Sequence, residues 1–385
     1  MVTLASAENA LKSVYLGTVT ELLNTKTNPL LSKIEQTSSD VWGKEIRKAA
    51  SYGINGGVGA GDEDGDLPTP KSTNYVQFVT TLKNLYGQIE ISDKAIRASA
   101  DGKGAFTDLL NNELQGLLDA SKFNLGRMLY GDGTGLLCNV TEVTGGSVKV
   151  NHTHNLIEGL VVDVYNGAGS MIGTARVTFV DRGASTVKLD TTVSGIAAGC
   201  KLYVQKSKDK EITGLGAIFA ETGTLYGVSR DTHPFLKPYK KDAVGNIDEI
   251  VLQEAIDRLE MTAGSTVDFI AASQTAKYAY QEYMSQYKRN IDIMELNGGF
   301  KTLSYNGIPL VYDRFVPDGG MYLLNTKAFK LHQLCDWRYL ETENGKILRQ
   351  TQGKPTYTAT LVKYCDLICD KPNGQAYLGG ITRTA

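Results

Sequence analysis

Apolar residues spaced three and four apart lead up to Leu129, and they predict a long helix with one buried face. At 1.5 Å per residue, a helix of about 25 residues would be roughly 38 Å long and could act as a strut. A strand-like alternation, Gln88–Ile91, precedes it, and Gly131 follows it. We expect Gly131 to end the helix in the left-handed backbone that glycine adopts at least cost. The apolar stripe consists of Leu110, Leu114, Leu117, Leu118, Leu125, Met128 and Leu129.

Two strand-like stretches, residues 41–52 and 74–92, flank a stretch in which six glycines occur within thirteen residues. Glycine at this density does not build a core element, so we expect a ribbon of two extended arms with a mobile tip. A two-stranded ribbon is marginally stable alone in water and needs a surface to lie on. A disordered surface loop is the alternative. The glycines are Gly53, Gly56, Gly57, Gly59, Gly61 and Gly65, and Pro68 and Pro70 follow them.

Residues 138–210 change to short β-rich runs separated by turn signals such as Gly145-Gly146 and Asn166-Gly167. Strands at about 12-residue spacing with such turns are typical of a small β-barrel or sandwich. The runs are 148–150, 160–165, 175–180, 186–189 and 202–205.

The remainder of the chain returns to mixed structure after a turn at Gly214. Its patterns predict two helices, at residues 247–261 and 273–289. They also predict strands, at residues 267–271, 307–312, 321–325, 337–343, 356–369 and 376–381. Pro309 suits an edge strand or the start of a strand.

Composition limits the possible functions. The 385 residues are enough for two or three domains, and 40 basic against 42 acidic residues give a formal net charge of −2. A dedicated nucleic-acid binder would show a basic stripe, although a container that encloses nucleic acid is not excluded. The start of the chain lacks the pattern of a signal peptide, and no stretch approaches a membrane span, so synthesis in a cytoplasm is expected.

Candidate chemistry is sparse. Asp62, Asp64 and Asp66 alternate like the start of a calcium loop, but Gly65 and Thr73 do not fit that motif, so a solvated acidic tip is expected. His152 and His154 would share one strand face without a third metal ligand nearby. We expect no catalytic residue, cofactor site or metal site, and no enzyme. The cysteines, Cys138, Cys200, Cys335, Cys365 and Cys369, are expected to be reduced, packed thiols.

The strand, the long helix and the sequence Tyr130-Gly131-Asp132-Gly133-Thr134-Gly135-Leu136, downstream of a glycine-rich loop, together resemble tailed-bacteriophage major capsid proteins. The resemblance implies the Hong Kong 97-type capsid fold, of the α+β class, with an inserted small β-barrel or sandwich module. It also implies a division of the chain. This is an N-terminal arm (1–40), extended loop (41–92), spine helix of the peripheral domain (93–137), inserted β module (138–210), return to the main fold (211–246), axial domain (247–336), peripheral-domain strands (337–371) and C-terminal return to the axial domain (372–385).

The resemblance implies a protein that assembles itself into an icosahedral head shell, built of pentamers and hexamers, around the double-stranded DNA of a bacteriophage. Such a protein belongs to the virion, is assembled in the bacterial cytoplasm, binds DNA without sequence specificity and has no membrane partner. Portal and decoration proteins are implied partners. The arm and extended loop come within the first forty to fifty residues, so a separate scaffolding protein is expected in place of a fused one.

Two other functions remain open at the sequence level. An encapsulin-type nanocompartment would have the same fold, and a monomeric sugar-binding or adhesive protein could be built around the β-rich segment. Some capsid relatives also cross-link lysine to asparagine between subunits. Lys71 and Lys83 are present, but no motif assigns such a pair.

Overall fold

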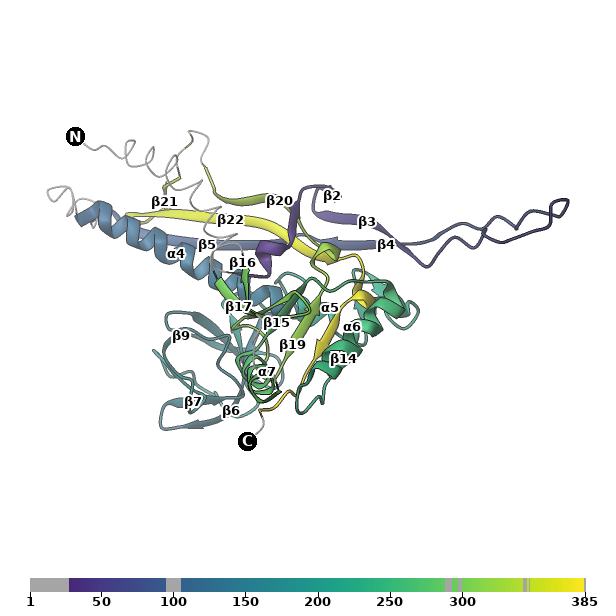
Figure 1. The fold of residues 1–385 in the computed structure, drawn as a ribbon. Coiled ribbons are helices and arrows are strands. Elements are labelled where there is room, and N and C mark those ends of the chain that lie inside the picture. Colours follow the sequence, from purple (N-terminus) through teal and green to yellow (C-terminus); the bar gives the residue numbers. More distant parts are fainter. Residues whose placement is uncertain are drawn as a thin grey trace.

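The computed structural model describes residues 28–94, 105–287, 293–296, 300–341, 345 and 347–383. Its spine is helix α4 (Ala105–Tyr130), which runs alongside the strands β5 (Lys83–Ser92) and β22 (Thr356–Cys369) (Figure 1). Its 26 residues make it about 39 Å long. Leu114, Leu118, Leu125 and Leu129 of the predicted stripe are buried, and Leu117 is half-buried. The predicted long amphipathic helix is therefore confirmed.

A five-stranded sheet lies against α4. Its centre is β22 (Thr356–Cys369), which pairs with β5 (Lys83–Ser92) on one side and with β20 (Phe329–Tyr339) and β21 (Arg349–Gln350) on the other. The short β1 (Glu35–Thr37) adds to β20 in parallel. A Cβ atom on Gly87 of β5 would lie 2.8 Å from Cδ1 of Leu117, so glycine lets the helix approach the sheet closely.

A second sheet of seven strands forms the other half of the main body, in the order β14-β23-β19-β15-β18-β17-β16. Helices α6 (Glu249–Ala263) and α7 (Gln274–Tyr287) share its core through Leu252, Leu259 and Tyr280. The strands are β14 (Tyr239–Lys241), β15 (Phe269–Ala272), β16 (Ile293–Leu296), β17 (Phe300–Tyr305), β18 (Ile308–Tyr312), β19 (Met321–Leu324) and β23 (Ala376–Leu378).

Helix α6 shows how the sequence sets an element's ends. Asp248 is the N-cap, and its carboxylate accepts a hydrogen bond of 2.8 Å from the Val251 amide. Gly264 follows the last turn with φ of 53°, in the left-handed region. The predicted helix at 247–261 is thus confirmed, displaced by two residues.

A narrow ribbon leaves the main body as a long projection (Figure 1). It consists of β3 (Glu45–Tyr52) and β4 (Asn74–Thr81), paired antiparallel in register from Glu45 opposite Thr81 to Tyr52 opposite Asn74. The two-residue β2 (Val41–Trp42) pairs with the start of β3. Only Leu82 separates β4 from β5, so the ribbon extends outward from the edge of the five-stranded sheet.

The segment after α4 forms a closed barrel with the strand order β10-β7-β6-β11-β8-β9. It has its own core of buried aliphatic side chains, among them Leu137, Val162, Val187 and Leu202. The strands are β6 (Leu136–Thr144), β7 (Ser147–Val150), β8 (Val161–Tyr165), β9 (Met171–Asp181), β10 (Thr186–Leu189) and β11 (Lys201–Val204). All five predicted runs are strands, but β6 was missed.

Short elements connect these parts. Helix α5 (Leu215–Ile218) follows the barrel, and β12 (Thr224–Leu225) and β13 (Val228–Ser229) form a hairpin after it. The 3-10 helices are η2 (Leu31–Lys33), η3 (Pro234–Leu236), η4 (Thr326–Ala328) and η5 (Pro372–Gly374). The described helices include none that is long and apolar enough to span a membrane.

Two local predictions were wrong. Gly131 is not left-handed; Gly133 and Gly135, at φ of 84° and 78°, take that role instead. The reason is that α5 lies against the end of α4, where the Ala217 amide donates a 3.4 Å hydrogen bond to the Gly131 carbonyl oxygen. The strand expected at 337–343 begins at Phe329 and ends at Tyr339. Pro309 is the second residue of β18, which confirms the expected position at the start of a strand, although β18 is an interior strand.

The first 27 residues of the predicted N-terminal arm lie outside the described residues.

Candidate assembly surfaces

The ribbon tip, residues 53–73, carries apolar side chains with no core to enter. Ile54, Val58 and Leu67 are 86%, 86% and 90% exposed. The turn at its end holds four carboxylates within five residues, Asp62, Glu63, Asp64 and Asp66. Exposed apolar residues on an extended projection are typical of a surface that another chain covers.

Glycine allows the two arms of the tip to lie close together. A Cβ atom on Gly59 would lie 3.2 Å from Cγ of Pro68, and one on Gly57 would lie 3.3 Å from the Lys71 amide nitrogen. The end of the tip is a turn in which the Gly65 amide donates to the Asp62 carbonyl oxygen at 3.1 Å. The tip is therefore a narrow two-armed extension, as the sequence predicted.

The base of the ribbon is held by the β12–β13 hairpin. The Val79 amide of β4 donates a 2.9 Å hydrogen bond to the Tyr226 carbonyl oxygen. The buried Tyr226 hydroxyl donates to the Leu367 carbonyl oxygen at 3.1 Å and accepts from the Cys369 amide at 3.0 Å. Burial raises the pKa of this phenol well above its usual value, so it stays neutral. The hairpin thereby joins the ribbon to β22.

A buried carboxylate makes a second connection at the same place. Asp366 of β22 accepts hydrogen bonds from the Thr80 hydroxyl and the Thr213 amide, both at 2.7 Å. Burial raises its pKa from the usual aspartate value. Nearby, Lys48 of β3 forms a 2.6 Å ion pair with Asp370. The base of the ribbon is therefore joined to the main body by hydrogen bonds and an ion pair.

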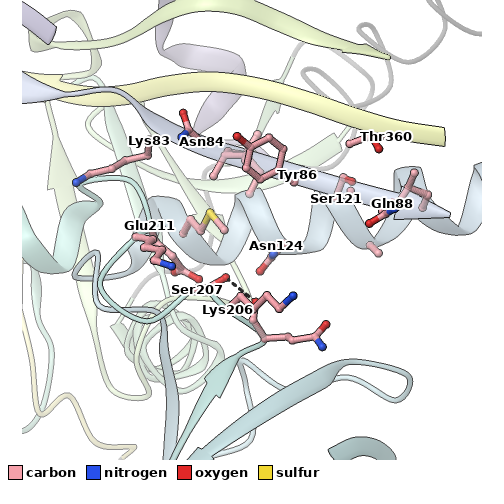
Figure 2. Close-up of a pocket in the computed structure, with 18 of the residues that line it drawn as sticks. Lys83, Asn84, Tyr86, Gln88, Ser121, Asn124, Lys206, Ser207, Glu211 and Thr360 are labelled. Carbon is pink, nitrogen blue, oxygen red and sulfur yellow. Dashed lines mark hydrogen bonds between the residues drawn. The ribbon is translucent and has the colours of Figure 1, made fainter. Parts of the chain in front are cut away.

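A groove of about 1090 Å³ lies between the spine and the barrel. Figure 2 shows Asn124 of α4 between β5, which carries Tyr86, and the loop that carries Lys206. This barrel exit loop, residues 205–211, follows β11 and leads back to the main body. The groove is larger than the 300–1,000 Å³ of typical small-molecule pockets.

A buried ion pair fixes the barrel exit loop. Arg127, in the last turn of α4, pairs with Glu211, and the two side chains are 3% and 2% exposed. Arg127 also donates to Oδ1 of Asn124 at 2.8 Å. The Asp209 amide donates a 2.8 Å hydrogen bond to the Thr134 carbonyl oxygen, so the chain enters and leaves the barrel side by side. The barrel exit loop, which lines the groove, is therefore fixed to α4 and to the start of the barrel.

Sequence reasoning did not single out Lys363, whose side chain is fully buried. Its ammonium group lies 2.6 Å from Oδ1 of Asp336 and donates to Oε1 of Gln333 at 2.7 Å. These contacts join β22 to β20. A lysine in the middle of a strand has no local signal of such a role, because its partners lie about thirty residues away in the sequence.

The histidine pair differs from the prediction. His152 and His154 lie in a loop of the barrel, not on a strand face, and their rings stack with centroids 4.2 Å apart. Burial lowers the pKa of His154 to about 4, with contributions from His152 and Arg314. Burial also lowers the pKa of His152.

The other candidate groups stay apart. The described residues contain no group of three histidine, cysteine, aspartate or glutamate side chains that could hold a metal ion, and the tip aspartates form none. All five cysteines are free thiols. Burial raises the pKa of Cys138 and Cys365 to about 12. Lys71 lies on the tip and Lys83 on β5.

No protein-family model matches the sequence, and no curated protein matches it. Among solved structures, the chain is similar to a chain of the cyanophage A-1(L) capsid asymmetric unit. Their identity is 14% and the TM-score is 0.57, over 95% of this chain and 93% of that one.

Two further structures are more distant. The SrpI encapsulin of Synechococcus elongatus PCC 7942 has 11% identity and a TM-score of 0.49, over 94% of this chain and 90% of that one. The capsid of Myoviridae phage XM1 has 7% identity and a TM-score of 0.47, over 92% of each chain. The cyanophage likeness, which spans nearly the whole of both chains, shows that this chain has the phage capsid fold predicted from its sequence.

Proposed function

We propose that this chain is the major capsid protein of a tailed bacteriophage and assembles itself into the icosahedral shell that encloses the double-stranded DNA. The observation that carries the proposal is the shared fold with the cyanophage capsid chain over 95% of this chain's length. Its projecting ribbon supports the same function, because a two-stranded ribbon gains stability only when it lies on another surface.

This function depends on noncovalent association between copies of the chain. Ile54, Val58 and Leu67 on the tip are exposed in the single chain, and covering apolar surface contributes about 25 cal/mol for each Å² removed from water. When each copy binds its neighbour through two different surfaces, the copies form a closed ring if a whole number of the rotations between neighbours makes a full turn. Pentamers and hexamers of this chain would form the shell in this way, each ribbon lying on a neighbouring copy.

The segments take the roles expected for such a protein. Residues 1–40 serve as the N-terminal arm. Residues 41–81 serve as the extended loop, which is shorter than the expected 41–92 because β5 belongs to the five-stranded sheet. The spine helix and the five-stranded sheet form the peripheral domain, and the seven-stranded sheet forms the axial domain. The barrel is an inserted module. The partners of the chain are a separate scaffolding protein, a portal and possible decoration proteins. The net charge of −2 fits a shell that encloses DNA without binding it through a strongly basic surface.

Electron microscopy of the purified full chain tests the proposal. We expect closed shells or free pentamers and hexamers, and shells from infected cells that contain DNA. A chain that stays monomeric at every concentration would contradict the proposal and favour the adhesive alternative. Shells that contain a cargo enzyme instead of DNA would show an encapsulin-type compartment.

A further inference from the structure

The barrel joins the main body through a narrow neck, where the entering and leaving chains lie side by side. The Asp209 amide donates to the Thr134 carbonyl oxygen at 2.8 Å. The Glu211 amide donates to the Gly133 carbonyl oxygen at 3.3 Å. The core of the barrel shares no residue with the cores of the main body, and Figure 1 shows the barrel as a separate lobe beside the seven-stranded sheet. A module attached in this way can rotate as a unit unless a second contact holds it.

The second contact is made by the β18–β19 loop, residues 313–320, which is itself fixed to α4. A Cβ atom on Gly126 of α4 would lie 2.7 Å from Cε2 of Phe315, whose ring is buried. The guanidinium group of Arg314 lies 4.9 Å from the ring centroid of Phe123 and 5.5 Å from that of Phe315. The loop therefore presents Arg314 from a fixed position.

Charged groups from both sides meet where this loop faces the barrel. Arg314 interacts electrostatically with Arg182 and Glu158 of the barrel. His154 of the barrel interacts in the same way with Asp318 and Arg314 of the loop. Within the described residues, no hydrogen bond or ion pair crosses between the barrel and this loop. The contact is therefore sensitive to the charge of the groups that form it.

The stacked histidines of the barrel belong to this contact. The ring centroids of His152 and His154 are 4.2 Å apart. Burial lowers the pKa of His152. The pKa of His154 is lowered to about 4, chiefly by burial; His152 and Arg314 also lower it, whereas Asp318 raises it. Both rings are thus neutral at pH 7, and two imidazolium rings at this distance would repel each other.

The charged groups around the pair balance one another while the histidines are neutral. Glu158 and Asp318 offset Arg182 and Arg314. Burial raises the pKa of Asp313, so its negative charge weakens as the pH falls. Positive charge added to the histidines is therefore uncompensated. The charged and titratable groups that face the pair or its partner arginine are Glu158, Arg182, Tyr312, Asp313, Arg314 and Asp318.

We propose that the stacked histidines and the β18–β19 loop form an acid-sensitive latch: protonation of the histidines separates the barrel from the loop, and the barrel then rotates about its neck. Because docking lowers the pKa of both histidines, the latch is closed above pH 6.5 and opens as the pH falls toward 4. Acid thereby changes which face of the barrel the subunit presents. The latch lies within one chain, so the inference is independent of shell assembly.

Distances between spin labels in the free full-length subunit test the latch. The labels are attached at M171C on the barrel and M261C on α6, whose native side chains are 50% and 88% exposed, and C335S removes the half-buried native thiol. At pH 7.5 we expect one narrow distance distribution. At pH 5, where an ordinary carboxyl group stays mostly ionised, the ratio of open to closed subunits should rise by up to about 30-fold through His154 alone. Neutralisation should restore the narrow distribution.

Glutamine variants assign the effect to the latch. H152Q/H154Q should keep the narrow distribution at pH 5, and each single variant should open less than the unsubstituted chain. H233Q, at the N-cap of η3, is the matched control and should open fully. The inference is overturned if the distance is unchanged at pH 5, or if H152Q/H154Q opens to the same extent. Loss of circular dichroism at pH 5 would also overturn it, because the change would then be unfolding rather than rotation.

Discussion

Phe78 of β4 and Tyr226 of the β12–β13 hairpin pack with ring centroids 5.3 Å apart, and both side chains are buried. Tyr226 has φ of 50° and Gly227 has φ of 78°, the two positive values of the tight turn that presents the phenol ring to the ribbon. This contact fixes the base of a projection whose end has no core of its own.

Replacing Tyr226 with phenylalanine should loosen this base. The ring stays, but the Leu367 carbonyl oxygen and the Cys369 amide lose their buried partner. We expect the free energy of unfolding to fall by about 1–3 kcal/mol. Urea unfolding of the free subunit measures this change. Tyr75→Phe, on the exposed part of β4, is the matched control and should have no effect; equal losses in both variants would contradict the assignment.

Leu125→Asp should prevent folding of the subunit. Leu125 is 2% exposed on α4, and an unpaired carboxylate there costs several kcal/mol, roughly the whole stability of a domain. Solubility and circular dichroism report the outcome. Gln115→Asp, on the exposed face of the same helix, should fold normally. A soluble Leu125→Asp subunit with an unchanged thermal midpoint would show that α4 is not the core helix described here.

Deleting the tip, residues 53–73, should spare folding and abolish assembly. The tip contributes no residue to the buried core, so the thermal midpoint of the free subunit should stay unchanged. Bridging Tyr52 to Asn74 with a two-residue Asn-Gly turn preserves the last ribbon pair. Hydrogen exchange adds a second measurement: the tip should exchange fast in free subunits and slowly in shells. Equal strong protection in both states would refute a role in assembly.

The barrel should fold without the rest of the chain. Its core is separate from that of the main body, and Thr134 and Asp209 are already joined by a hydrogen bond at its neck. The best excision therefore runs from Gly135 to Lys208, because removing only residues 140–208 would leave part of β6 behind. A short Gly/Ser bridge should give a folded subunit, and isolated residues 135–209 should show a cooperative thermal transition. An insoluble main body together with an unfolded segment would show one shared core.

Acid should destabilise the free subunit through His154. Its pKa is about 4 when folded and 6.5 when unfolded, so the unfolded chain binds more protons between these values. Stability therefore falls as the pH is lowered from 6.5 to 4. The loss is at most about 3 kcal/mol and is reduced by solvent screening of the half-buried ring. In the His154→Gln variant, the thermal midpoint should depend less on pH across this range than in the unsubstituted subunit. If the midpoint falls with decreasing pH as steeply in the variant, other groups cause the acid effect.

The sequence alone determined those parts whose signal is local. The spacing of Leu114, Leu118 and Leu125 places one face of α4 in the core, since a helix repeats every 3.6 residues. The glycines between Gly53 and Gly65 exclude a packed element, and the alternating runs of the barrel mark strands because a strand repeats every two residues. The acidic character of the tip could also be predicted from the sequence.

Only the tertiary structure decided what these elements meet. Thr80 and Asp366 are 286 positions apart in the chain, and Arg127 and Glu211 are 84 apart. The repeat of hydrophobic residues along a helix or strand cannot predict these pairs. They depend on which strand lies beside β22 and on where the chain leaves the barrel. The missed β6 and the left-handed turns at Gly133 and Gly135 have the same cause. Their conformations follow from the barrel and from α5, which close over the end of α4 after the chain has left it.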